Sequence, residues 1–205
     1  RTLAIFIGEE RAQTTFADFK IAAPLEVPSG TQSSDLHGFH FDTVIEGLDP
    51  LPYSIAPLPD GRILLTEKMR GLTVISADGE QSGLVPGAPE GYDDAPQRGI
   101  LRMGNGWILD VAPHPDFDDN GWIYLSYGDR CSDCNEHSRS GAPVSALKLI
   151  RGRIRDGNWV DEETLWEVGK EHYTPGTDMA AGGRIAFDHA GHLFLSFGMM
   201  PGLGY

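Results

Sequence analysis

The two cysteines of the chain, Cys131 and Cys134, are three residues apart, and this spacing allows three kinds of chemistry. A disulfide between them would close a short loop and would persist in an oxidising compartment. A metal site would need two further ligands, for which His137 and either Asp129 or Asp133 are the candidates. Attachment of a c-type haem is not expected, because Asn135 rather than histidine follows the second cysteine. The spacing therefore favours a disulfide that fixes an insertion between strands, with a metal site or free thiols as the alternatives.

A short acidic segment, Asp116–Gly121, matches the opening of a calcium-binding loop of the pattern D-x-D-x-N-G. The twelfth position of such a loop requires an acidic residue, but Tyr127 stands there. The segment also falls where a repeat in the sequence requires a hairpin turn. We therefore predict a solvated turn at this place.

Three stretches of the chain repeat one pattern, and this pattern predicts the strands and turns that position the residues described above. Each contains a β-branched residue followed by alanine, then a turn closed by glycine, then an apolar run that ends in serine or threonine. Glycine supplies the positive φ that a tight hairpin turn needs, and the apolar run is expected to be a buried strand. The stretches are 54–66, 110–126 and 184–196, and their turn glycines are Gly61, Gly121 and Gly191.

The repeat predicts an all-β protein of the β-propeller type, in which sheets of some four short strands recur along the chain. Further strands are expected at 146–154 and 158–160, on either side of a turn at Asp156–Asn158. A β-sandwich whose hairpins resemble one another by chance is the alternative.

The predicted domain organisation has two parts. Residues 1–40, rich in proline, glycine and serine towards their end, are expected to form an N-terminal extension or linker, and residues 41–205 an incomplete propeller domain. The predicted blades, about two and a half in number, lie near 49–90, 104–168 and 182–205. Propellers close with about 4–8 blades, and an open ring would expose strand edges and blade faces. We therefore expect the remaining blades to come from a second chain or from a missing C-terminal half.

The amino-acid composition indicates which classes of fold and of binding partner suit this chain. Glycine and proline account for 26 and 14 of the 205 residues, which favours short strands joined by many turns over a helical bundle. The formal net charge of −14 makes a nucleic-acid partner unfavourable, because the phosphate backbone would be repelled. No apolar run approaches the roughly 20 residues that a transmembrane helix requires.

From about Val44 to Gly198 the chain resembles the N-terminal half of the soluble quinoprotein sugar dehydrogenases, the glucose/sorbosone or aldose sugar dehydrogenase family. The resemblance is carried by Leu58–Arg62 (LPDGR), Leu109–Phe117 (LDVAPHPDF) and Gly182–Phe187 (GGRIAF), in the order and spacing of the family. It implies a six-bladed propeller in a periplasmic or secreted protein that uses pyrroloquinoline quinone (PQQ) with calcium. It further implies oxidation of the anomeric hydroxyl of an aldose, with electrons passed to an external acceptor.

The resemblance also assigns site positions, some of which are altered. Asn105 stands where the family has a glutamine that lines the quinone site, so Asn105 is expected to contact the cofactor. The family's general base is a histidine four residues before the arginine that corresponds to Arg184, and that position here is Ala180. An aspartate of the family is likewise replaced by Met199. The residues that hold the quinone and calcium are expected mostly outside this chain.

A general base within hydrogen-bond reach is worth roughly 10²–10⁴ in rate, and alanine cannot supply one. His172 and Asp178, in the segment that leads to Ala180, are the predicted replacements. The leading prediction is thus a PQQ-dependent sugar dehydrogenase-like propeller acting on a small-molecule sugar. The alternatives are a catalytically degenerate propeller that serves as a binding or assembly module and, more weakly, a metal-dependent lactonase-like hydrolase.

Overall fold

The computed structural model describes residues 28–41, 43–48, 52–92, 106–138, 141, 143–175 and 181–198, and gives the backbone alone at 97–98 and 101–102. Contacts divide the chain into two compact units, Arg1–Pro50 and Leu51–Tyr205. The predicted end of an N-terminal linker after residue 40 stays a prediction. None of the helices in the described ranges has the length and apolar character needed to span a bilayer.

In the first unit, β1 (Gln32–Ser33) and β2 (Gly38–Phe39) form a short antiparallel hairpin. Ser34 closes its turn from both sides. The Ser34 N–H donates to the His37 carbonyl at 2.8 Å, and the Ser34 hydroxyl accepts from the His37 N–H at 3.2 Å. Such local hydrogen bonds are the reason why serine is common in turns.

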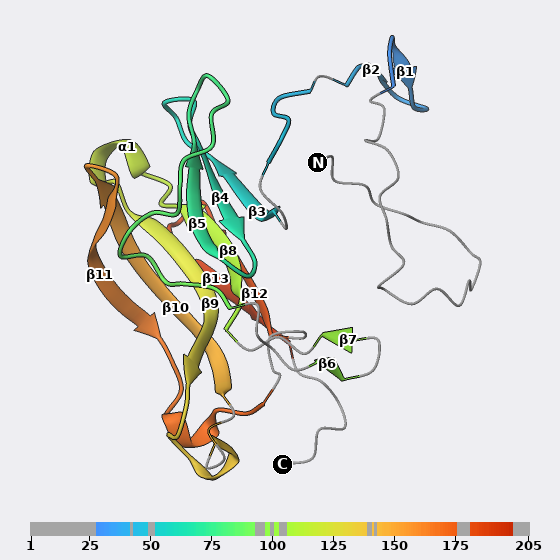
Figure 1. Ribbon diagram of the computed structural model, residues 1–205. Coiled ribbons are helices and arrows are strands. Elements are labelled where there is room, and N and C mark those ends of the chain that lie inside the picture. Colours follow the sequence, from blue (N-terminus) through green and yellow to red (C-terminus); the bar gives the residue numbers. More distant parts are fainter. Residues whose placement is uncertain are drawn as a thin grey trace. The chain divides into compact units, whose positions relative to one another are not determined.

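The second unit consists of antiparallel sheets whose strands follow one another in chain order (Figure 1). Sheet 1 contains β3 (Pro52–Pro57), β4 (Ile63–Glu67) and β5 (Gly71–Ile75). Sheet 2 contains β8 (Ile108–Pro113), β9 (Ile123–Cys131), β10 (Val144–Arg155) and β11 (Asn158–Trp166). Sheet 3 contains β12 (Gly182–Phe187) and β13 (Leu193–Phe197), and a small separate hairpin joins β6 (Gln97–Arg98) to β7 (Leu101–Arg102).

The predicted repeat forms the first two strands of each sheet. The turn glycines Gly61, Gly121 and Gly191 all have positive φ, at 87°, 67° and 83°, as the pattern predicted. In the second copy the turn contains one helical turn, α1 (Phe117–Asn120), which ends where the Gly121 N–H donates to the Phe117 carbonyl at 2.7 Å. The first strands of the sheets, β3, β8 and β12, are neighbours, because β8 contacts β3 on one side and β12 on the other.

Strand β8 separates two hydrophobic cores. Ile108 and Val111 belong to the core shared with sheet 1, whereas Leu109 belongs to the core shared with sheet 3. A register irregularity between Ile108 and Asp110 accompanies this change of direction. Because β8 is covered on both faces, four of its six residues are buried and the other two are partly buried.

The outer strand β11 is longer than predicted, since it continues beyond 160 to Trp166. The extension includes the acidic run Asp161–Glu163, although acidic residues disfavour strands. Arginines of β10 stabilise this part of the pairing: Arg151 binds Glu163 at 2.6 Å, and Arg153 binds Asp161 at 2.9 Å. The side chains of the acidic run remain largely solvent-accessible, as expected for an edge strand.

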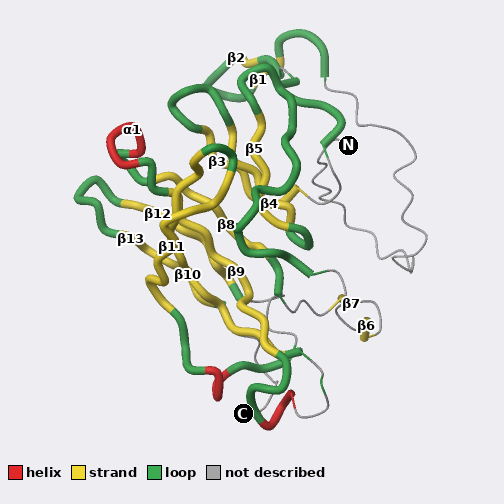
Figure 2. The backbone as a smooth tube through the Cα atoms, turned by 60° about the vertical axis from the view of Figure 1, so that its left-hand side comes forward, coloured by secondary structure: helices red, strands yellow, loops and turns green. Residues whose placement is uncertain are grey.

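Two short 3-10 helices, η2 (Glu136–Ser138) and η3 (Lys170–His172), lie at the same end of sheet 2 (Figure 2). The first belongs to the connection from β9 to β10, and the second follows β11. Asn135, just before η2, donates from its side chain to the Lys170 carbonyl of η3 and so joins the two.

Candidate functional site

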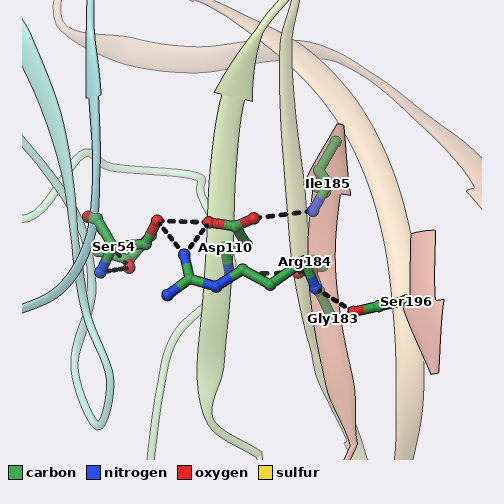
Figure 3. A network of polar contacts seen from close by, with 8 residues as sticks. Ser54, Asp110, Gly183, Arg184, Ile185 and Ser196 are labelled. Atoms are coloured by element: carbon green, nitrogen blue, oxygen red, sulfur yellow. Dashed lines mark hydrogen bonds and ion pairs between the residues drawn. The ribbon is translucent and has the colours of Figure 1, made fainter. Parts of the chain in front are cut away.

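The first strands of the three sheets each contribute one polar side chain to a common cluster (Figure 3). Ser54 on β3, Asp110 on β8 and Arg184 on β12 occupy the same position of the repeat, two residues before its alanine. The Arg184 Nη1 atom lies 3.0 Å from Asp110 Oδ1 and 3.2 Å from Ser54 Oγ. The Ser54 hydroxyl also donates to Asp110 Oδ1. The cluster thus joins all three sheets at their innermost strands.

Asp110 is the centre of this cluster. Its carboxylate is buried, with 7% of the side chain exposed, and its second oxygen accepts the backbone N–H of Ile185 at 2.8 Å. A buried carboxylate is costly unless charge and hydrogen bonds compensate it. Here one guanidinium, one hydroxyl and one amide donate to it, so that the start of β12 is fixed to β8.

A hydroxyl on the second strand supports each of these three positions. Thr66, Ser126 and Ser196 accept the backbone N–H groups of residues 54, 110 and 184 at 3.0, 3.1 and 2.9 Å. The register is irregular at the same place in every sheet, as in a β-bulge. The hydroxyls therefore satisfy N–H groups that an uninterrupted ladder would have paired.

Sheets 2 and 3 approach one another closely at Gly183. Its φ is 84°, and a Cβ atom placed there would lie 2.8 Å from Leu109 Cδ1 and 3.1 Å from Ser126 Oγ. The Ser126 hydroxyl donates to the Gly183 carbonyl at 2.5 Å. Both the backbone conformation and the available space thus require glycine at this position.

Cations and aromatic rings gather near the beginnings of the inner strands. The Lys68 ammonium lies 4.0 Å from the centroid of the Trp107 ring and 4.5 Å from that of Tyr53. The Arg184 guanidinium carbon lies 5.7 Å from the Tyr53 ring, and 62% of the Arg184 side chain is exposed. Ammonium and guanidinium groups held over rings in this way can donate to the oxygens of a polar ligand.

This cluster orients groups but does not provide a general base. Both oxygens of the Asp110 carboxylate already accept hydrogen bonds, from the Ser54 hydroxyl, the Arg184 guanidinium and the Ile185 N–H, so the carboxylate is not free to take a proton from a substrate. Removal of a proton from a sugar hydroxyl therefore requires a group other than Asp110.

Of the two residues predicted to act as the general base, only His172 lies within the described residues. His172 lies in η3, its side chain is 70% exposed, and its Nε2 atom is 3.6 Å from Glu171 Oε1. The described residues give it no contact with Ser54, Asp110 or Arg184. Asp178, together with Ala180, lies outside the described residues, so the role of each stays a prediction.

The cofactor prediction also depends on residues that the structure does not describe. Asn105 and Met199 lie outside the described residues. Within the described ranges, no three His, Cys, Asp or Glu side chains gather as a metal site.

The disulfide prediction is confirmed, since Cys131 and Cys134 are bonded to one another. His114, in the turn after β8, is structural: its Nδ1 atom accepts the Asp116 N–H at 3.0 Å, and its ring stacks on Tyr124. Ser54 and Asp110 were absent from the predicted site residues. The signal that could have found them is the repeat itself, which aligns both with Arg184.

Comparisons with known proteins agree with this architecture. The family described as "Glucose / Sorbosone dehydrogenase" matches residues 50–200. The aldose sugar dehydrogenase YliI of Escherichia coli is 28% identical over 150 residues, which cover 72% of this chain and 35% of that protein. The chain spans about a third of the length of the curated relatives it matches.

Two solved structures are similar to the described fold. The apo form of the soluble aldose sugar dehydrogenase of Escherichia coli matches with a TM-score of 0.50 and 26% identity, over 72% of this chain and 38% of that one. The PQQ-bound aldose sugar dehydrogenase of Streptomyces coelicolor matches with a TM-score of 0.52 and 22% identity, over 77% and 40%. The second likeness bears on the fold alone.

These findings confirm the predicted all-β fold: sheets 1, 2 and 3 are successive blades of a β-propeller rather than halves of a β-sandwich. The family match covers both cores and all three members of the cluster at the inner strands. The chain belongs to the glucose/sorbosone dehydrogenase family.

Proposed function

We propose that this chain forms part of a quinone-dependent aldose dehydrogenase. In this proposal PQQ, bound together with calcium, would supply the oxidising chemistry at the anomeric carbon of the sugar. The inner ends of the blades bind and orient the sugar, and electrons leave to an external acceptor. The residues that hold the quinone and calcium belong mostly to other parts of the propeller.

The observation that carries this proposal is the cluster of Ser54, Asp110 and Arg184 within a chain of this family. It fixes the beginning of β8, which follows Asn105, and the beginning of β12, which follows Ala180. The two strands that follow these family positions in the sequence are thus fixed to one buried carboxylate. Arg184 is largely exposed beside it and can donate hydrogen bonds to sugar hydroxyls.

The remaining blades are part of the proposal. Large apolar side chains are exposed on the two outer blades: Ile55 on β3 is 62% exposed and Phe194 on β13 is 57% exposed. Burying such a side chain contributes roughly 1.5–3 kcal/mol. We propose that further blades, from a continuation of the chain or a second chain, cover these faces.

The Cys131–Cys134 disulfide supports a periplasmic or secreted location, because disulfides persist in oxidising compartments. This location is a proposal that fractionation of cells expressing the protein would test. Recovery of the protein with oxidised cysteines from the periplasm or medium is the expected result, and an exclusively cytosolic protein with free thiols would contradict it.

The test of activity uses the complete protein, titrated with PQQ and calcium and assayed with aldoses and a redox dye. Dye reduction that depends on both groups is expected. The variants His172→Asn and Asp178→Asn then identify the base, since loss of a general base lowers kcat by roughly 10²–10⁴. A variant with unchanged kcat removes that residue from consideration.

A second candidate function is favoured by Ala180, which occupies the family's base position. A propeller without a base would serve as a binding or assembly module. Binding of PQQ or sugar without turnover would support this function. Turnover of a lactone with metal and without quinone would instead support the hydrolase alternative.

A further inference from the structure

The connection from β9 to β10 begins with the disulfide and continues into η2. Cys131 is the last residue of β9, and Cys134 lies three residues later. Between them Asp133 has a φ of 59°, which is unusual for a residue other than glycine. The disulfide thus closes a tight loop in which the chain reverses immediately before Asn135.

Both the nitrogen and the oxygen of the Asn135 side-chain amide form hydrogen bonds. Its Nδ2 group donates to the carbonyls of Lys170 at 2.8 Å and Tyr173 at 2.9 Å. Its Oδ1 atom accepts the His137 N–H at 2.9 Å. The Lys170 carbonyl belongs to η3 and also accepts the Tyr173 N–H at 3.2 Å, whereas the Tyr173 carbonyl belongs to the residue that follows η3. Asn135 therefore caps η3 from a distant loop.

The capped segment is held to sheet 2 at two further places. Tyr173 is fully buried, and its hydroxyl donates to Asp129 on β9 at 2.7 Å, while Lys170 binds the same carboxylate. The backbone of Thr174 exchanges hydrogen bonds of 3.1 and 3.0 Å with Ser145, next to the start of β10. The segment 170–174 is thus fixed to the strand ends on either side of the disulfide loop.

We infer that the Cys131–Cys134 disulfide and Asn135 form a redox-sensitive latch that holds the segment 170–174 against the end of sheet 2. Both cysteines are partly exposed, so a dithiol can reach them. A thiolate of the dithiol attacks one sulfur and forms a mixed disulfide. Its second thiol then displaces the protein thiol, so that the dithiol is oxidised and two protein thiols are formed.

Reduction removes the covalent reason for the turn at Asp133. The loop can then leave its left-handed conformation, and Asn135 loses the orientation in which it binds two carbonyls. The remaining contacts of the segment, through Asp129 and Ser145, do not involve the loop. The expected change is therefore local loosening of 170–174 rather than unfolding of the blade.

The catalytic consequence of this latch rests on the proposed function. The segment carries His172 and leads along the chain to Asp178 and Ala180. In an active enzyme, reduction would alter the positioning of the predicted base candidates and lower turnover. The latch itself is a property of the fold and can be measured without any activity.

The experiment is amide hydrogen exchange of the complete protein, oxidised and after treatment with dithiothreitol. Exchange at Tyr173 and Thr174 is expected to become about tenfold faster on reduction, as loss of hydrogen bonds to a docked segment implies. Asn135→Ala should reproduce this increase with the disulfide intact. Asn158→Ala, which removes an amide bound only within the β10–β11 hairpin, is the matched control and should have no effect there.

Equal exchange rates at these amides in the oxidised and reduced protein would overturn the inference. Acceleration that extends equally to the core strands β4 and β9 would also overturn it, because that result describes loss of the whole fold. Faster local exchange without dehydrogenase activity in either redox state would leave the latch established and reject the proposed function alone.

Discussion

Arg184 and Asp110 form an ion pair whose partners have opposite environments. The Nη1 to Oδ1 distance is 3.0 Å; 62% of the arginine side chain is exposed, whereas only 7% of the aspartate side chain is. The pair connects β12 to β8 and therefore joins two blades. Its contribution depends on the buried partner, because the carboxylate cannot regain water if the arginine is removed.

We expect Arg184→Ala to lower the free energy of unfolding by about 2–3 kcal/mol, the range for a charged hydrogen bond lost at a buried group. The matched control is Arg155→Ala. Arg155 is equally exposed, at 61%, and binds Asp161 at 2.9 Å, but that carboxylate is itself 38% exposed. An exposed pair contributes about 1 kcal/mol or less. Urea denaturation compares them, and equal losses would contradict the role of Asp110 burial.

The hydroxyl of Ser126 has two partners, whereas that of Ser196 supports one backbone N–H at a more exposed position. Ser126→Ala leaves the Asp110 N–H and the Gly183 carbonyl without this partner in a buried place. We expect a loss of about 2 kcal/mol for Ser126→Ala and about 0.5 kcal/mol for Ser196→Ala. Thermal and urea unfolding would measure both, and the reverse order would refute the assignment.

Gly183→Ala should destabilise the protein by about 2–3 kcal/mol, since the new methyl group meets Leu109 and Ser126 as well as an unfavourable φ. Gly191→Ala is the control, because Gly191 has nearly the same φ of 83° but open space where the new methyl group would lie. Its expected cost is about 1 kcal/mol, from backbone strain alone. If both variants lose the same free energy, close packing at Gly183 is not the cause.

Stability should fall in the alkaline range. Burial raises the pKa of Tyr173 to about 12; the hydrogen bond with Lys170 opposes this increase and the nearby Asp129 carboxylate adds to it. Burial opposes an increase in the pKa of Lys170, but Asp129 and Tyr173 outweigh it and raise that pKa as well. Both groups hold their protons more tightly in the folded protein. The stabilisation is therefore complete below about pH 10 and is lost as the pH rises towards 12.

The variant Tyr173→Phe measures how much of this loss of stability at alkaline pH comes from the Tyr173 hydroxyl. We expect it to lower stability at pH 8 through loss of the bond to Asp129, and to reduce the fall between pH 10 and 12 by about 2 kcal/mol. Tyr127, whose pKa burial also raises, stays in both proteins and cancels in the comparison. Urea unfolding at each pH, with phenolate absorbance alongside, gives the result. An unchanged alkaline slope in the variant would exclude Tyr173 as its source.

Hairpins could be predicted from the sequence because their determinants are local. The positive φ of Gly61, Gly121 and Gly191 and the apolar run after each depend on neighbouring residues only. The length of β11 could not be predicted in this way. Its acidic residues are stabilised by arginines of the preceding strand, so the pairing depends on a register that composition does not reveal.

The cluster at the inner strands illustrates the same limit. The family resemblance pointed to Arg184, but its partner Asp110 lies 74 residues earlier in the chain. Their contact depends on two blades lying side by side and on irregular register in both strands. Aligning the three copies would have pointed to Ser54 and Asp110, because a shared repeat position becomes a shared place in the ring.

In each blade, a hydroxyl on the second strand accepts a backbone N–H of the first strand at the register irregularity. The register of each first strand is therefore determined within its own blade. Such blades are interchangeable modules in the geometric sense. A blade transferred into a related propeller should keep its strand register if the hydroxyl residue is transferred with it. The neighbouring blade of the new propeller must still provide the partner side chain, a carboxylate for Ser54 or Arg184 and a cation or hydroxyl for Asp110.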